Sequence, residues 1–246
     1  MDRVKTGIVG LDELMDGGIP KNNVVLLSGL TGSGKTILAL QYLVKGAELY
    51  NEKGLFITFE ESREDVISQA SQLGWDLVEM ENKNMFKILA LAPSKTQFIN
   101  VTNIIGDSVR NFSPSRLVLD SISTYGLYAE TLKQMEIMQM MGVEADKFQF
   151  VTTPEVATRH AIIDMIECIK NLKLTSLVVS ELPEETAFLS RDTMSEFLSD
   201  GVILLKHVSM GDNLHRSIEV RKMRRTNIHG GPRSYEITGT GIAIQA

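Results

Sequence analysis

A glycine-rich segment near the N-terminus has the residue types and the spacing of a phosphate-binding loop. It follows the pattern Gly-x-x-x-x-Gly-Lys-Thr from Gly29 to Thr36. Glycines let backbone N–H groups turn toward phosphate oxygens, a lysine at this point reaches the β and γ phosphates, and the threonine hydroxyl binds Mg²⁺. We therefore predict ATP as the ligand and Mg²⁺ as its metal ion. The expected ATP-binding residues are Leu30, Thr31, Gly32, Ser33, Gly34, Lys35, Thr36 and Ile37.

Three carboxylates follow apolar segments whose ends belong at the same edge of a parallel sheet. Asp120 closes one such segment, and at this position it would hold Mg²⁺ together with Thr36. Glu60 and Glu61 follow another, where a carboxylate can orient or deprotonate the water that attacks the γ-phosphate. Adjacent glutamates point in different directions, so one is expected to be the base and the other a support. The sequence does not choose between them, and the alternative is that both begin a solvated helix.

A basic segment near the C-terminus offers a second set of candidate catalytic groups. Lys222 and Arg224 are separated by one residue, so on a strand both lie on one face and can converge on one anion. Cations delivered to the phosphates of an ATPase accelerate hydrolysis by about 10³-fold or more. The competing interpretation is a solvated or nucleic-acid-binding face.

The elements around these residues predict an α/β protein, and together with the phosphate loop they resemble the RecA-like P-loop fold. Apolar runs and helical spacing alternate along the chain, which is typical of a mainly parallel sheet flanked by helices. Turn signals after Gly201 indicate antiparallel hairpins at the C-terminal end. We expect one domain over residues 1–246. The predicted strands are 24–28, 55–59, 116–120, 175–180, 202–208, 217–223 and 234–237, and the predicted helices are 35–49, 64–73, beginning after a Ser62 cap, and 157–172.

Composition and charge exclude several classes of protein. The longest apolar runs are strand-sized, far below the roughly 20 residues of a membrane-spanning helix, and the first residues do not resemble a signal peptide. We therefore expect a cytoplasmic protein without membrane insertion. The net charge of −6 argues against a protein whose whole surface binds nucleic acid. The single cysteine, Cys168, has apolar neighbours at helical spacing and is predicted to be a buried small hydrophobe.

The Met-rich segment of residues 125–153 has no clear pattern of secondary structure. Core or helix packing is the favoured interpretation, and an adaptable surface for an unidentified protein partner is the alternative. Related DNA-handling ATPases place their DNA-binding loops in this region. Here its acidic residues outnumber Lys133 and Lys147, so a phosphate backbone would be repelled.

Motifs spread over nearly the whole chain make it resemble the KaiC-type branch of the RecA superfamily. The resemblance implies a ring-shaped homohexamer that binds ATP, and releases ADP, at subunit interfaces. Glu60 and Glu61 match the catalytic glutamates of that branch, Lys222 and Arg224 match cations that reach the γ-phosphate of a neighbouring subunit, and Arg216 matches a position that packs on adenine. Arg225 and His229 depart from the usual pattern. The matching motifs begin at Thr6, Gly17, Gly29, Thr58, Gly74, Leu119, Ser180, Glu196 and Lys222.

These observations favour a Mg²⁺-dependent ATPase whose hydrolysis has a regulatory or signalling role. One alternative is a DNA-handling ATPase like the recombinases of the same superfamily. A second alternative is a nucleotide-sensing scaffold that binds ATP with negligible turnover.

Overall fold

A computed structural model describes residues 2–91, 101–129, 154–184, 188–210 and 213–245 of the chain. Most of the Met-rich segment, residues 130–153, for which core or helix packing was predicted, lies outside this described part. None of the described helices combines the length and the apolar character that crossing a bilayer requires.

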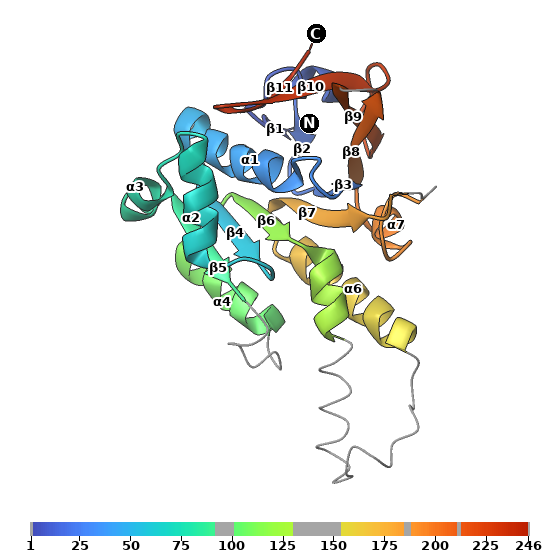
Figure 1. The fold of residues 1–246 in the computed structure, drawn as a ribbon. Helices are drawn as coiled ribbons and strands as arrows, with labels where there is room; N and C mark the ends of the chain where they lie inside the picture. The colour runs from blue at the N-terminus through green and yellow to red at the C-terminus, as the bar shows by residue number, and fades with distance from the viewer. Residues whose placement is uncertain (1, 92–100, 130–153, 185–187, 211–212, 246) are drawn as a thin grey trace.

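A mixed nine-stranded sheet forms the centre of the described structure (Figure 1). Six neighbouring strands are parallel, in the order β8-β3-β7-β6-β4-β5, and β9, β10 and β11 continue the sheet beyond β8 in antiparallel fashion. The strands are β3 (Val24–Leu30), β4 (Gly54–Thr58), β5 (Phe86–Ala90), β6 (Arg116–Asp120), β7 (Thr175–Leu182), β8 (Gly201–Met210), β9 (Asn213–Met223), β10 (Arg233–Thr238) and β11 (Gly241–Ile244). A separate short pair joins β1 (Arg3–Val4) to β2 (Ile19–Pro20).

Helices cover both faces of the parallel strands and give the protein two apolar cores. Alternate residues of a strand face opposite ways, so Val25 and Leu27 of β3 join one core and Val24 and Leu26 join the other. The first core also holds residues of α1 (Lys35–Tyr50), α2 (Arg63–Gln72) and α3 (Leu77–Asn82). The second holds residues of α4 (Val101–Phe112), of the helical residues 122–129 and of α6 (Pro154–Asn171).

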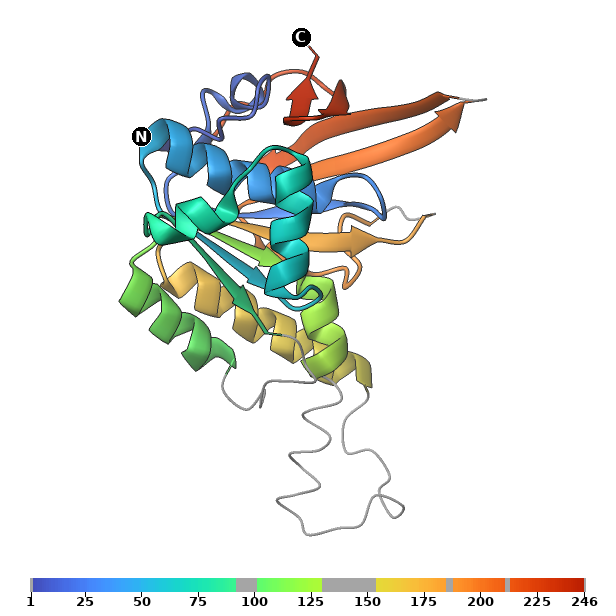
Figure 2. The same ribbon diagram turned by 60° about the vertical axis from the view of Figure 1, so that its left-hand side comes forward.

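The register of the parallel strands brings their carboxyl ends to one edge of the sheet. Gly29 of β3 pairs with Glu181 of β7, and Thr58 of β4 pairs with Asp120 of β6. β8 and β9 extend past this edge and project from the body of the protein (Figure 2). Loops that follow β3, β4, β6 and β7 therefore meet in one region, which is where open α/β sheets bind ligands.

The predicted fold class is confirmed. The bounds of each predicted strand and helix agree with an observed element to within about two residues, except that β9 and α6 begin earlier than predicted. Ser62 does cap α2, in a capping box with Asp65. The sequence interpretation missed several elements. They are β1, β2, the 3-10 helix of Asp12–Met15, α3, β5, α4, the helical residues 122–129, the short helix α7 (Ser195–Leu198) and β11. The prediction of a buried Cys168 was wrong in degree, because this residue of α6 is only partly buried; burial still raises the pKa of its thiol.

Candidate active site

The glycine-rich loop connects β3 directly to α1. β3 ends at Leu30, and α1 begins at Lys35, with Gly34 as its N-cap residue in the left-handed conformation at φ 87°. The positive φ means that any side chain at this position would strain the backbone, and a Cβ atom here, 2.9 Å from Cδ1 of Ile237, would also require the Ile237 side chain to move. The Ser33 hydroxyl donates to the Leu30 carbonyl at 2.7 Å and closes the turn.

A cavity of about 260 Å³ opens beside this loop. Its walls come from the loop, from the ends of three neighbouring strands and from the C-terminal hairpin. The lining residues are Gly32, Gly34, Lys35, Thr36, Ile37, Glu60, Asp120, Glu181 and Ile237. Most of the residues predicted to bind ATP and metal are therefore brought together, as the shared sheet edge requires.

Asp120 and Thr36 form the centre of the predicted metal site. The Thr36 hydroxyl donates to Oδ2 of Asp120 at 2.8 Å, so the hydroxyl and the carboxylate converge on one point. Burial raises the pKa of Asp120 to about 7, helped by the nearby charges of Glu60 and Glu61, whereas the Thr36 hydrogen bond and Lys35 act in the opposite direction. The Thr36 hydroxyl oxygen and the buried Asp120 carboxylate can therefore bind a divalent cation such as Mg²⁺. The charge of that cation would stabilise the ionised form of the carboxylate.

Lys35 supplies the positive charge on the other side of the cavity. Its side chain is buried, and its ammonium donates to the Leu30 carbonyl at 3.0 Å. Burial lowers the pKa of this ammonium, and the carboxylates of Glu181, Asp120 and Glu60 oppose that shift. A phosphate chain in the cavity would replace part of the lost hydration with direct charge pairing.

The two adjacent glutamates occupy different surroundings. Glu60 lines the cavity, and Oε1 of its carboxylate accepts hydrogen bonds from the hydroxyls of Ser121, at 2.6 Å, and Thr124. Glu61 instead accepts a 2.6 Å hydrogen bond from Gln69 of α2. Both backbone N–H groups donate to the Thr58 hydroxyl at the end of β4, which fixes the turn that separates the two side chains.

Lys222 and Arg224 lie at the opposite end of the sheet from the cavity. Lys222 pairs with Val202 of β8, which pairs with Leu26 of β3, three residues before Gly29. At about 3.3 Å per residue this offset is roughly 10 Å. The Arg224 N–H donates to the Asp200 carbonyl, and the Asp200 N–H donates in turn to the carbonyl of Val24, so Arg224 is level with the start of β3.

The side chains of these two cations contact the segment around α7. The Lys222 ammonium donates to the carbonyls of Glu196 at 2.8 Å and Ser199 at 2.7 Å. Arg224 forms an ion pair with Asp200 at 3.0 Å, and its side chain stays 51% exposed. Arg224 is therefore available to a neighbouring molecule.

Arg216 lies on the cavity side of the sheet. It pairs with His207 where β8 and β9 extend past the carboxyl end of β3. Burial raises the pKa of Tyr235 to about 12, and the positive charge of Arg216 partly opposes this increase. The Tyr235 hydroxyl in turn donates to the carbonyl of Ser33 in the loop. Within the described residues, Nε of Arg216 is buried without a hydrogen-bond partner.

Two cavity residues were not predicted as site residues. Glu181 follows the apolar residues of β7, as Asp120 follows those of β6. The signal that identified Asp120, a carboxylate at the end of an apolar strand, could therefore have identified Glu181 as well. Ile237 comes from β10, more than 200 residues after the loop, and apolar periodicity alone carries no signal for such a contact.

The fold and this cavity define a nucleotide-binding protein of the RecA-like P-loop class. A family profile described as the KaiC ATPase matches residues 4–149 and 146–246, and the chain belongs to this family. It is therefore an ATP-binding protein with an ATPase domain.

Known relatives agree with this assignment. The chain is 33% identical over 244 residues to the circadian clock oscillator protein KaiC of Picosynechococcus, covering 99% of this chain and 44% of that protein. For circadian clock oscillator protein KaiC 1 of Synechocystis the identity is 32%, with the same coverage. The chain thus spans less than half the length of these curated relatives. A solved KaiC-like protein from the archaeon Pyrococcus horikoshii OT3 is 31% identical, with a TM-score of 0.82, and the match covers 100% of this chain and 99% of that one.

Proposed function

We propose that this protein hydrolyses ATP at the interfaces of a homohexamer, with a regulatory or signalling role. The observation that carries the proposal is the separation of two sets of groups. Lys35, Thr36, Glu60 and Asp120 surround one cavity, whereas the exposed Arg224 lies at the other end of the sheet. A head-to-tail ring places such opposite surfaces of neighbouring subunits together at every interface.

The residues of the cavity have different roles in hydrolysis. Lys35 and the loop N–H groups hold the phosphates, and Thr36 and Asp120 would hold Mg²⁺, which when bound neutralises charge on the β- and γ-phosphate oxygens. Glu60 is the proposed base. Ser121 and Thr124 both donate to Oε1, and among the described residues none hydrogen-bonds Oε2, which leaves that oxygen to accept a proton from the attacking water.

Glu61 has a supporting role in this proposal. Its hydrogen bond with Gln69 ties the turn after β4 to α2, and the turn sets the direction of Glu60. As the oxygen of the water bonds to the γ-phosphorus, the bond to the ADP oxygen breaks and negative charge builds on the leaving group. Lys222 and Arg224 of an adjacent subunit supply positive charge at that stage, and Arg216 contacts the adenine.

The proposal is tested by size-exclusion chromatography with light scattering, with and without Mg-ATP, followed by a phosphate-release assay on the same fractions. We expect a hexamer with Mg-ATP that releases phosphate. Turnover by a monomer would contradict the shared site, and a hexamer that retains ATP without releasing phosphate would instead identify a nucleotide-sensing scaffold.

A further inference from the structure

The segment that follows Arg224 is held by residues from the other end of the chain. Residues 225–229 lie between β9 and β10, and the first residues of the protein lie beside the C-terminal strands (Figures 1 and 2). The contacts come from two side chains, those of Arg3 in β1 and of Asp16, which follows the 3-10 helix of Asp12–Met15. Neither side chain lines the phosphate cavity, so any effect on the chemistry there is indirect.

Asp16 contacts this segment through both oxygens of its carboxylate. Oδ2 accepts a hydrogen bond from the Asn227 N–H at 2.8 Å, and Oδ1 lies 2.6 Å from Nε2 of His229. The hydrogen bond with His229 and then that with Asn227 are the largest causes that lower the pKa of the Asp16 carboxyl, so it is ionised at neutral pH. Hydrogen bonds to an ionised acceptor are stronger than neutral ones. Asp16 therefore fixes two points of the chain that follows β9.

Arg3 joins the same segment to the N-terminal part of the chain. Nη1 of its guanidinium donates to the Thr226 hydroxyl at 3.0 Å and to the Gly18 carbonyl at 2.9 Å. Nη2 donates to the Arg225 carbonyl at 3.3 Å and lies 3.4 Å from Oδ2 of Asp16. These contacts need the planar fork of arginine, because a lysine presents only one nitrogen.

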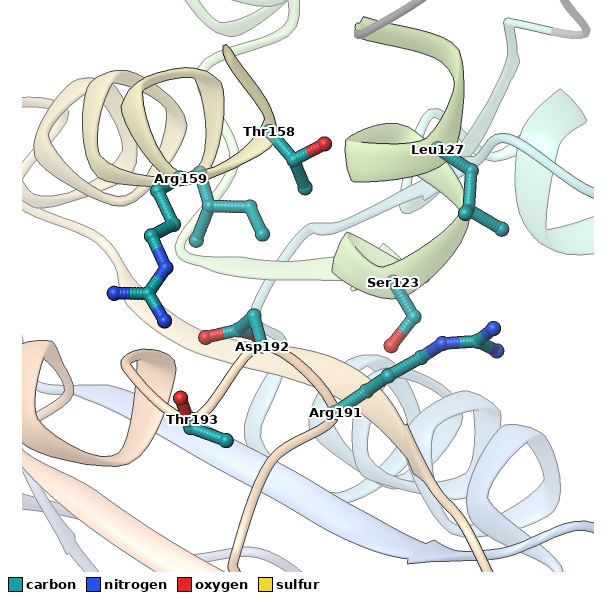
Figure 3. Close-up of a pocket in the computed structure, with 8 residues that line it drawn as sticks. Ser123, Leu127, Thr158, Arg159, Arg191, Asp192 and Thr193 are labelled. Carbon is teal, nitrogen blue, oxygen red and sulfur yellow. The ribbon is translucent and has the colours of Figure 1, made fainter. Parts of the chain in front are cut away.

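The segment around α7 provides a second group of contacts, to Arg224 itself. Asp200 forms the 3.0 Å ion pair with its guanidinium, and the Asp200 carbonyl accepts from the Arg224 N–H at 2.8 Å. The start of α7 is held by Asp192, whose Oδ1 accepts from the Ser195 N–H at 2.6 Å; Asp192 also lines a separate cavity of about 270 Å³ (Figure 3). The position of Arg224 thus depends on the α7 segment and on the residues that follow Arg224.

Arg224 needs this support because it lies beyond the end of β9. β9 ends at Met223 and β10 begins at Arg233, so the sheet does not place the chain between them. Arg225 adopts the left-handed conformation, with φ 61°, which residues other than glycine adopt only infrequently. A displacement of about 1 Å at a reacting group can lower a rate by about 100-fold. The contacts that hold residues 225–229 are therefore expected to affect the rate.

We propose that Arg3 and Asp16 are positioning residues of the shared site, which hold Arg224 where it reaches the nucleotide of the neighbouring subunit. This inference rests on the proposed function, since it assumes that Arg224 acts on another subunit. It has a specific consequence. A change at Asp16 impairs a subunit as the donor of Arg224 and leaves the phosphate cavity of that subunit intact.

Asp16→Asn tests the positioning role with little change of shape. Asparagine tolerates the left-handed conformation of Asp16, at φ 52°, and keeps one acceptor oxygen while the charge is lost. We expect phosphate release to fall by about 10-fold or more, with ATP binding retained in calorimetry. Arg3→Lys, which keeps the charge but not the fork, should lower release as well. Asp107→Asn is the matched control, because it removes the same charge from an exposed ion pair on α4 and should leave the rate unchanged.

Mixed rings assign the defect to one side of the interface. When equal amounts of Asp16→Asn and Lys35→Ala are mixed, about one interface in four joins an intact Lys35 to a fully intact donor. Phosphate release should then rise to about a quarter of the natural rate. A mixture of Asp16→Asn with Arg224→Ala should show no recovery, because both subunits are impaired as donors.

Several results would overturn the proposal. Recovery with Arg224→Ala would place the defect in the subunit's own phosphate cavity, and a natural rate in Asp16→Asn would show that Arg224 does not depend on Asp16. Failure to recover with Lys35→Ala, after confirmed subunit exchange, would show a merely structural role. If Lys35→Ala and Arg224→Ala also fail to restore each other, the shared site itself is refuted, and the positioning role with it.

Discussion

Two inactive variants, Lys35→Ala and Arg224→Ala, should restore each other's activity when their subunits are mixed. Lys35 lies in the phosphate cavity, whereas Arg224 is level with the start of β3. Gly29 is five residues further along the strand, which places the Arg224 backbone roughly 17 Å from the loop at about 3.3 Å per residue. Arg224 is therefore expected to act on the nucleotide of another subunit.

The size of the recovery follows from the ring. An active interface needs an intact Lys35 on one side and an intact Arg224 on the other. In rings assembled at random from equal amounts of the two variants, about one interface in four has this combination. Each variant alone has none, and loss of an arginine that acts in this way lowers the rate by about 10³-fold or more. Mixing should thus restore about a quarter of the natural rate against a very low background.

The assay is steady-state phosphate release after subunit exchange has been confirmed by fluorescence energy transfer between labelled variants. Arg110→Ala mixed with Lys35→Ala serves as a control for charge loss outside the site and should itself retain activity. If phosphate release stays at the background of the single variants after confirmed exchange, the shared site is refuted. Lys222 and Arg224 would then be assigned to a surface that binds a partner or nucleic acid.

Further predictions follow from the geometry of the cavity. Lys35→Ala should abolish ATP binding in calorimetry, and an unchanged affinity would contradict the assigned site. Glu60→Gln should lower phosphate release by about 100-fold or more, as expected for a lost general base, and Glu61→Gln by clearly less; the reverse order would exchange their roles. Without Mg²⁺, folded Asp120 keeps its proton up to about pH 7, whereas the unfolded carboxyl loses it near 3.8. The unfolding free energy should therefore fall as pH rises through this window, by roughly 4 kcal/mol for a pKa difference of about 3. Urea denaturation of Asp120→Asn should lack this slope, and an equal slope in both proteins would refute the assignment.

The chemistry of the phosphate loop could be predicted from sequence because its determinants are local. Gly34, Lys35 and Thr36 are adjacent in the chain, and a glycine loop between a strand and a helix has few conformations available. The place of Asp120 also followed from the sequence, since the carboxyl ends of parallel strands share one edge. These two local rules were enough to predict the class of the fold and most of the residues that line the candidate phosphate cavity.

The tertiary structure was needed wherever the answer depends on contacts between distant segments. The difference between Glu60 and Glu61 is set by Ser121, Thr124 and Gln69, which belong to other elements. Periodicity predicted Lys222 and Arg224 on one strand face, but β9 ends at Met223, so Arg224 follows the strand. Periodicity could not place the two residues at one end of the sheet, because that position depends on the pairing of β9 with β8 and of β8 with β3. A one-residue change of register would alter every such neighbour without altering the pattern of residue types, so only the folded chain decides it.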